Sequence, residues 1–168
     1  MYRRRRCHLL LALLLFAASV GAETVAISVR LANGPENEPR LIPLLASIEE
    51  GAMDAMFAAG HIVFDIDLGE ASESTRFRAI DLARAGGATF LVLIDATFEV
   101  APGRGLVPSL TTVTVVDIES ERDMPADPVD PRTPAGAEDK PPGALSLEIG
   151  VRAAEHALNE IGEVEGVW

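Results

Sequence analysis

Carboxylates at alternating positions make residues 65 to 70 a natural starting point for metal chemistry. The run is Asp65-Ile66-Asp67-Leu68-Gly69-Glu70, and oxygen ligands spaced in this way open the calcium loop of an EF-hand. Such a loop also needs a glutamate at its twelfth position, which here is Arg76. Asp65 and Asp67 are therefore candidate cation ligands, but we expect them to lie on the solvated face of a strand that leads into a turn.

A second candidate ligand is Asp95, which follows the continuous apolar run Phe90 to Ile94. Such a run predicts a strand covered on both faces, and ligand sites of α/β proteins form at the carboxyl ends of central strands. The alternative, which we favour, is that the strand simply leaves the core at Asp95.

The sequence has no pattern typical of a histidine metal site or of a catalytic nucleophile. His61 and His156 have no further ligand at metal-binding spacing, and we expect structural or surface roles for both, His61 beside the end of a helix and His156 on the outer face of the last helix. A Gly-x-Ser-x-Gly elbow is absent from the sequence, and Gly103-Arg104-Gly105 lacks the rest of a nucleotide-binding loop. We predict no catalytic residue, no metal site and no cofactor.

Two periodicities predict the elements that position these residues. Apolar residues alternate from Val25 to Leu31 as in a half-buried strand, and they recur at helical spacing from Leu41 to Ala59, where Gly60 is placed to end the helix. The remaining expected elements are a strand at 62–68, a helix capped by Ser72 or Ser74 and ending near Ala85 with Phe77, Ile80 and Ala83 or Arg84 inward, strands at 90–100 and 110–118 joined by a long loop, and a helix from Leu147 to Ile161 that ends at Gly162.

Residues 120–144 differ in composition from the rest. They hold six prolines among acidic side chains, with Met124 and Val129 as the large apolar residues, which predicts a solvated loop or linker. We therefore expect a single α/β (α+β) domain formed by residues 23–119 and 145–168, with one mixed sheet in the order strand, helix, strand, helix, strand, strand, linker, helix, and with the helices packed on the sheet.

The N-terminus has the pattern of a cleavable signal peptide. Arg3 to Arg6 form a basic segment, Leu9 to Val20 an apolar one, and Gly21-Ala22 a small-residue site before Glu23. About 12 apolar residues span about 18 Å as a helix, less than the roughly 30 Å of a bilayer core. We expect Sec-type export, cleavage after Ala22, and a periplasmic or secreted protein without a permanent membrane span. The sequence leaves twin-arginine export open.

Cleavage would change the charge and remove the thiol. The full chain has 14 basic and 26 acidic residues and a net charge of −12, and loss of four arginines leaves 10 basic residues and a charge of −16. Such a surface repels nucleic acid and anionic lipid. The one cysteine, Cys7, lies within the predicted signal and precedes its apolar run, so neither a disulfide nor a lipid anchor is expected.

The segments "ASIEEGAMDAMFAAGHIVFD" (46–65) and "ARAGGATFLVLIDATFEV" (83–100), the strand at 112–119 and the terminal helix are similar in pattern to the envelope domain shared by TolB N-terminal modules, the curli secretion protein CsgG and the peptidoglycan-synthase activator LpoB. The resemblance implies a periplasmic, non-enzymatic domain that docks on other envelope proteins. The chain departs from these families because it has no following β-propeller, no paired barrel strands and no lipobox.

These observations rank three classes of function. The leading hypothesis is an exported, non-catalytic adaptor or accessory protein that binds another cell-envelope protein through its sheet edge, its Arg104 loop or the acidic segment 120–144. A periplasmic small-molecule or cation-binding domain that uses Asp65, Asp67 or Asp95 is the alternative. A small hydrolase is the third.

Overall fold

In the computed structural model, residues 22–34, 38–68, 73–132 and 139–165 are described. Within them, one mixed sheet of five strands packs with three helices, which confirms the expected α+β fold. The elements are β1 (Thr24–Asn33), α2 (Leu41–Ala58), β2 (Ile62–Asp65), α3 (Glu73–Ala85), β3 (Phe90–Ala101), β4 (Gly105–Asp117), β5 (Arg122–Val129) and α4 (Pro142–Glu165). Nearly all of the predicted signal peptide, Cys7 included, lies outside the described residues.

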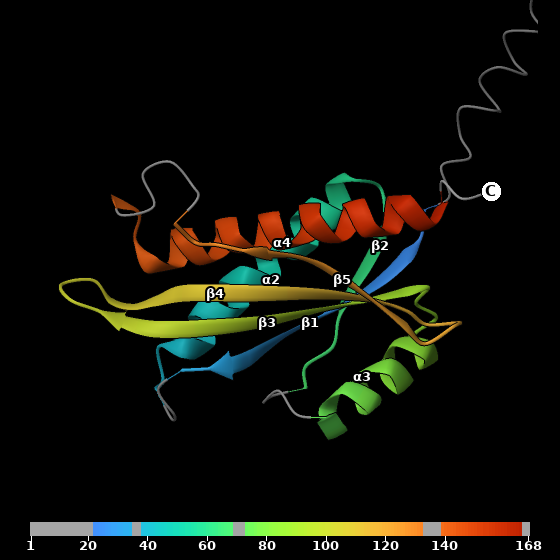
Figure 1. Ribbon diagram of the computed structural model, residues 1–168, viewed down its shortest axis with the longest axis horizontal. Helices are drawn as coiled ribbons and strands as arrows, with labels where there is room; N and C mark the ends of the chain where they lie inside the picture. The colour runs from blue at the N-terminus through green and yellow to red at the C-terminus, as the bar shows by residue number, and fades with distance from the viewer. Residues whose placement is uncertain (1–21, 35–37, 69–72, 133–138, 166–168) are drawn as a thin grey trace, which may run out of the picture.

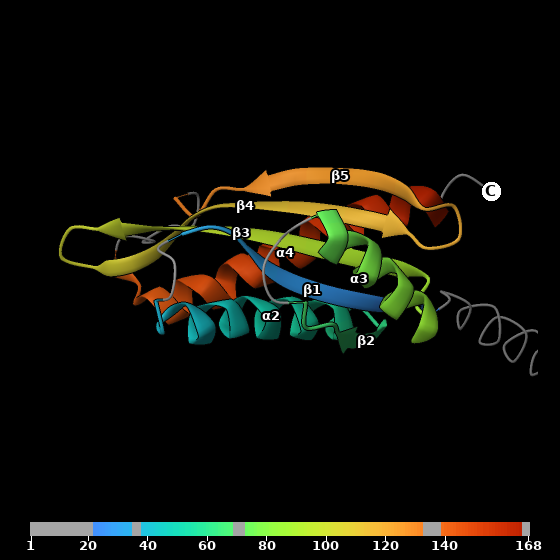
Figure 2. The same ribbon diagram turned by 90° about the horizontal axis from the view of Figure 1, so that it is seen from below.

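The sheet has the strand order β2-β1-β3-β4-β5. β1 pairs in parallel with both β2 and β3, whereas β3, β4 and β5 pair antiparallel. Helices α2 and α4 lie together on one face of the sheet and α3 lies on the other (Figure 1). α3 covers only one end of its face, and the β3–β4 hairpin projects beyond it (Figure 2).

The larger core lies between the sheet and the pair α2 and α4. Its buried side chains come from β1, β3, β4 and β5 and from the inner stripes of both helices; among the largest are Ile27, Ile48, Met56, Ile94 and Ile149. α4 thus returns to the same sheet as the other helices. Among the described residues, no helix combines the length and apolar character needed to cross a membrane.

Two glycines let α2 and α4 approach closely. Both helices carry a Ser-x3-Gly-x3-Ala stripe, centred on Gly51 in α2 and on Gly150 in α4. A Cβ atom at Gly51 would lie 2.1 Å from the carbonyl oxygen of Leu147, and one at Gly150 would lie 1.9 Å from that of Ile48. Backbone therefore packs directly on backbone at this crossing, where no larger residue fits without moving a helix.

The smaller core lies under α3. Ile80 and Ala83 are buried there as predicted, against Leu91, Leu93 and other residues of the sheet. Phe77, also predicted to face inward, is 57% exposed, so that prediction was wrong. The Arg76 guanidinium carbon lies over the Phe77 ring, 5.9 Å from its centroid, within the range of a cation–π contact.

Glycine turns end α2 and α3 where the sequence predicted. Gly60 has φ +97°, its N–H donates to Phe57 O, and the His61 N–H donates to Met56 O. The same pair of hydrogen bonds recurs after α3 at Gly87, φ +77°. Both are Schellman motifs, which require a left-handed residue and so favour glycine.

Several predicted boundaries need correction. β2 ends at Asp65 rather than at Leu68, although Ile66 and Leu68 stay buried. α4 begins at Pro142 and runs past Gly162 to Glu165. The long loop predicted after β3 is a short turn, since β3 ends at Ala101 and β4 starts at Gly105.

The largest correction concerns the segment 120–144, predicted as a loop or linker. Its residues Arg122–Val129 form β5, which pairs antiparallel with β4. Met124 and Val129 are buried in the larger core, so this part of the segment belongs to the packed domain. Residues 133–138 of this segment lie outside the described part of the chain.

Candidate functional site

The two edges of the sheet, β5 and β2, differ in what they offer a partner. β5 contains Pro125 and Pro128, which have no N–H group. Pro125 lies opposite Thr114 within the run of residues that pairs with β4, and the register of the pairing shifts between Thr111 and Val113, next to Pro128. Prolines of this kind protect an edge strand against further pairing.

β2 contains no proline. Ile62 donates its N–H to Glu23 O at 2.9 Å and Ile66 donates to Ile27 O at 2.8 Å. Because backbone groups alternate in direction along a strand, Val63 and Asp65 direct their N–H and C=O groups away from β1. β2 is the outermost strand on this side. We call the outward side of Ile62–Asp65 the β2 edge.

Apolar side chains lie exposed around the β2 edge. Ile62, at the start of the strand, is 59% exposed. On the α3 side, Phe64 is half-buried against the smaller core. Its ring lies so close to Gly86 that a Cβ there would be 2.5 Å from Cζ. The surface therefore combines backbone groups directed away from the sheet with exposed apolar side chains.

Three carboxylates lie near the end of the same strand. Asp65 ends β2 and Asp67 follows it, and both are exposed. Burial, and then the negative charges of Asp65 and Asp67, raise the pKa of Glu49 on α2. These side chains therefore share a region of negative potential. Among the described residues, no group of three or more His, Cys, Asp or Glu side chains is arranged to hold a metal ion.

Asp95 lies in the middle of β3 rather than at its end, opposite Arg30 of β1. The Arg30 guanidinium binds it through two hydrogen bonds, from Nε to Oδ1 at 2.7 Å and from Nη2 to Oδ2 at 2.6 Å. The side chains are 7% and 23% exposed. The Asp95 carboxylate thus neutralises the buried Arg30 guanidinium. Both of its oxygens accept hydrogen bonds from that side chain, so they are not directed at a bound ligand. Arg30 was not among the residues expected to form a site, because its only signal in the sequence is a charge in a mostly apolar strand.

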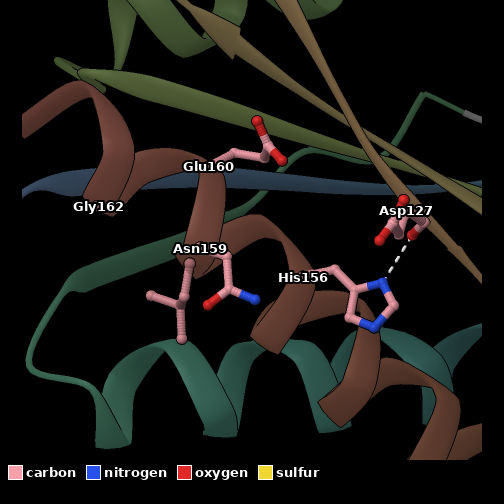
Figure 3. A pocket seen from close by; sticks show the side chains of 6 residues that line it. Asp127, His156, Asn159, Glu160 and Gly162 are labelled. Carbon is pink, nitrogen blue, oxygen red and sulfur yellow. Dashed lines mark hydrogen bonds between the residues drawn. The ribbon is translucent and has the colours of Figure 1, made fainter.

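An open groove of about 570 Å³ lies between β5 and the second half of α4. Its lining residues are Asp127, His156, Leu158, Asn159, Glu160 and Gly162 (Figure 3). His156 Nδ1 lies 2.6 Å from the carbonyl oxygen of Asp127, so this nitrogen carries the proton and donates. His156 is half-buried, which corrects its predicted place on the outer face. The hydrogen bond joins β5 to α4, and none of the described residues that line the groove is a serine, a cysteine or a lysine.

Arg104 and His61, which were also considered from the sequence, lie at positions where they contribute to the fold. Arg104, in the hairpin turn, donates from Nη2 to the carbonyl oxygen of Lys140 at 2.8 Å and so connects the hairpin to the start of α4. His61 follows the Gly60 turn as expected, and its Nδ1 is buried without a hydrogen-bond partner among the described residues.

No known protein family matches the sequence, and no curated protein does. Among solved structures, the chain is similar to the PelC dodecamer from Paraburkholderia phytofirmans, with 17% identity, 79% of this chain and 88% of that chain covered, and a TM-score of 0.42. A single-substitution variant of that dodecamer aligns with 15% identity over 79% and 90% of the two chains, at a TM-score of 0.43. Likeness at this level transfers neither function nor assembly. The resemblance to TolB, CsgG and LpoB stays a prediction.

Proposed function

We propose that this chain is an exported, non-catalytic accessory protein of the cell envelope that acts by binding another protein, with the β2 edge as its binding surface. The observation that carries the proposal is the contrast between the two sheet edges. A free edge strand is a template for pairing with another chain, and soluble proteins usually block it. Here Pro125 and Pro128 block β5, whereas β2 keeps its outward groups and has Ile62 exposed beside it.

Strand addition to a sheet edge is an established mode of protein recognition, in which main-chain hydrogen bonds give affinity and side-chain contacts give specificity. The alternatives receive less support. Asp95 is engaged by Arg30, and His156 is engaged by the backbone of β5. A ligand-binding or hydrolytic role therefore lacks a polar group directed at a substrate in either place.

Site-specific photo-crosslinking in the native host tests the proposal. A photoreactive amino acid replaces Ile62 in one strain and Val100, 71% exposed at the hairpin, in a control strain. We expect a crosslinked partner from position 62 that is absent from position 100, followed by reconstitution of the complex from the two purified proteins. Equal crosslinking at both positions, or none at either, would contradict the proposal.

A further inference from the structure

We infer that the β2 edge accepts an extended segment of alternating basic and apolar residues, with the basic side chains on the α2 side and the apolar ones on the α3 side. The inference rests on the proposed function and adds the chemistry of the partner. Three features carry it: the direction of the side chains of β2, the charge on one side of the strand, and the exposed apolar surface on the other.

Side chains of β2 alternate between the two cores. Val63 packs against the core that contains α2, whereas Phe64 packs against the core under α3. By the period of two, Asp65 shares the α2 side with Val63, and Ile62 shares the α3 side with Phe64. A strand added beside β2 would therefore also present its successive side chains to two different surfaces.

The α2 side carries negative charge. Glu49 and Asp65 form no ion pair with any described basic side chain. Burial and the charges of Asp65 and Asp67 raise the pKa of Glu49, so repulsion at this position is already felt in the free protein. A lysine or arginine placed opposite Asp65 would relieve the repulsion, and opposite charges across neighbouring strands stabilise pairing.

The α3 side is apolar. Ile62 is 59% exposed, and it shares this side of the strand with Phe64, which is half-buried against the smaller core. Leucine, valine or isoleucine side chains of an added strand would cover this surface and remove it from water. The two sides together select an alternating sequence rather than a uniformly basic or a uniformly apolar one.

Charge also argues against a second copy of this chain as the occupant. Two β2 edges paired with each other would bring two sets of Glu49, Asp65 and Asp67 together. Each complete chain carries a net charge of −12, and like charges of this size oppose association. A cationic segment, in contrast, is attracted to the same negatively charged surface.

Fluorescence anisotropy with labelled octapeptides tests the inference on the mature protein, residues 23–168. The probe alternates lysine and valine, a second peptide has the same composition with the lysines and valines in two blocks, and a third alternates glutamate and valine. We expect the alternating lysine peptide to bind about ten-fold more tightly than the block peptide, to weaken about ten-fold between about 20 and about 300 mM NaCl, and the glutamate peptide not to bind.

Matched variants locate the binding. Ile62→Lys is expected to weaken the alternating peptide about ten-fold, whereas Val100→Lys, which adds the same charge at the hairpin, should leave affinity within about two-fold. The double variant Glu49→Gln with Asp65→Asn should weaken binding, and Glu99→Gln with Glu155→Gln, an equal charge change elsewhere, should not.

Three results would overturn the inference: equal affinity for the alternating and block peptides, equal effects of the two lysine variants, or a dimer of the protein alone that Ile62→Lys abolishes. A crosslinked partner at position 62 combined with a failed peptide assay would leave the proposed function standing and remove only the assignment of a basic partner strand.

Discussion

Substitution of Gly150 by alanine tests the close crossing of α2 and α4. The new Cβ would lie 1.9 Å from Ile48 O, 2.8 Å from Ile48 C and 3.0 Å from Ala52 N. All three are main-chain atoms of a helix, so none can turn aside as a side chain would. Ordinary contact begins near 3.4 Å, and the two helices must therefore separate by about 1.5 Å at this point.

The loss of stability follows from the gap that this separation opens between α2 and α4. A gap of about 1 Å forfeits a quarter to a half of the dispersion energy between facing atoms, and this helix pair buries Ile48, Ala52, Ala153 and Ala154. Overpacking of this kind costs about 3 to 4 kcal/mol, at or just above the usual range. Alanine regains about 1 kcal/mol of helix propensity over glycine. The net expectation is a loss of about 2 to 3 kcal/mol, or about 4 to 12 °C in Tm for a domain of this size.

Urea and thermal unfolding followed by far-UV circular dichroism measure the effect. Gly162→Ala is the matched control, because it makes the same change in the same helix at a position where a Cβ meets nothing within 4 Å; it should stabilise the protein by about 0.5 to 1 kcal/mol. If the free energy of unfolding of Gly150→Ala lies within about 0.5 kcal/mol of the wild-type value, the two helices do not pack as closely at Gly150 as described.

Three further predictions concern charge and export. Asp95→Ala should destabilise the fold by about 2 kcal/mol in urea unfolding, below the range for a fully buried pair, because it leaves the Arg30 guanidinium buried without its counter-charge; an unchanged midpoint would refute this. Since the pKa of Glu49 is raised in the fold, its protonated form favours the native state, and stability is lost as pH rises above the usual glutamate pKa. Glu49→Gln should therefore raise Tm at pH 7 and flatten its decline from pH 4 to 7, and parallel curves would contradict the assigned cause. N-terminal sequencing of the exported protein should begin at Glu23, and a cell-associated product that keeps its first residues would exclude cleavage.

Regular periodicity made most of the fold predictable. The stripe of α2 and its terminal glycine identified that helix within one residue, and the alternation of Val25 to Leu31 identified β1. β5 was not predicted as a strand, because prolines such as Pro125 and Pro128 are usually excluded from strands. They are tolerated here because an edge strand pairs on one side only, and the position of a strand within a sheet is not visible in its local sequence.

The candidate site was predictable only in outline. A sheet edge was among the expected binding surfaces, but neither edge could be identified before the strand order was known. The Arg30–Asp95 pair shows the same limit, because its residues are 65 positions apart and meet only through the parallel pairing of β1 with β3. Asp95 was noticed for its place after an apolar run, whereas its partner determines its role.

The unequal edges of the sheet also bear on self-assembly of the chain by strand addition. A row of identical subunits grows when one edge of each copy pairs with the opposite edge of the next. Pro125 and Pro128 lie in one of the two edge strands, β5, and prolines in an edge strand oppose such pairing. The chain therefore has a device against growth into ribbons or fibrils by repeated pairing of β5 with β2.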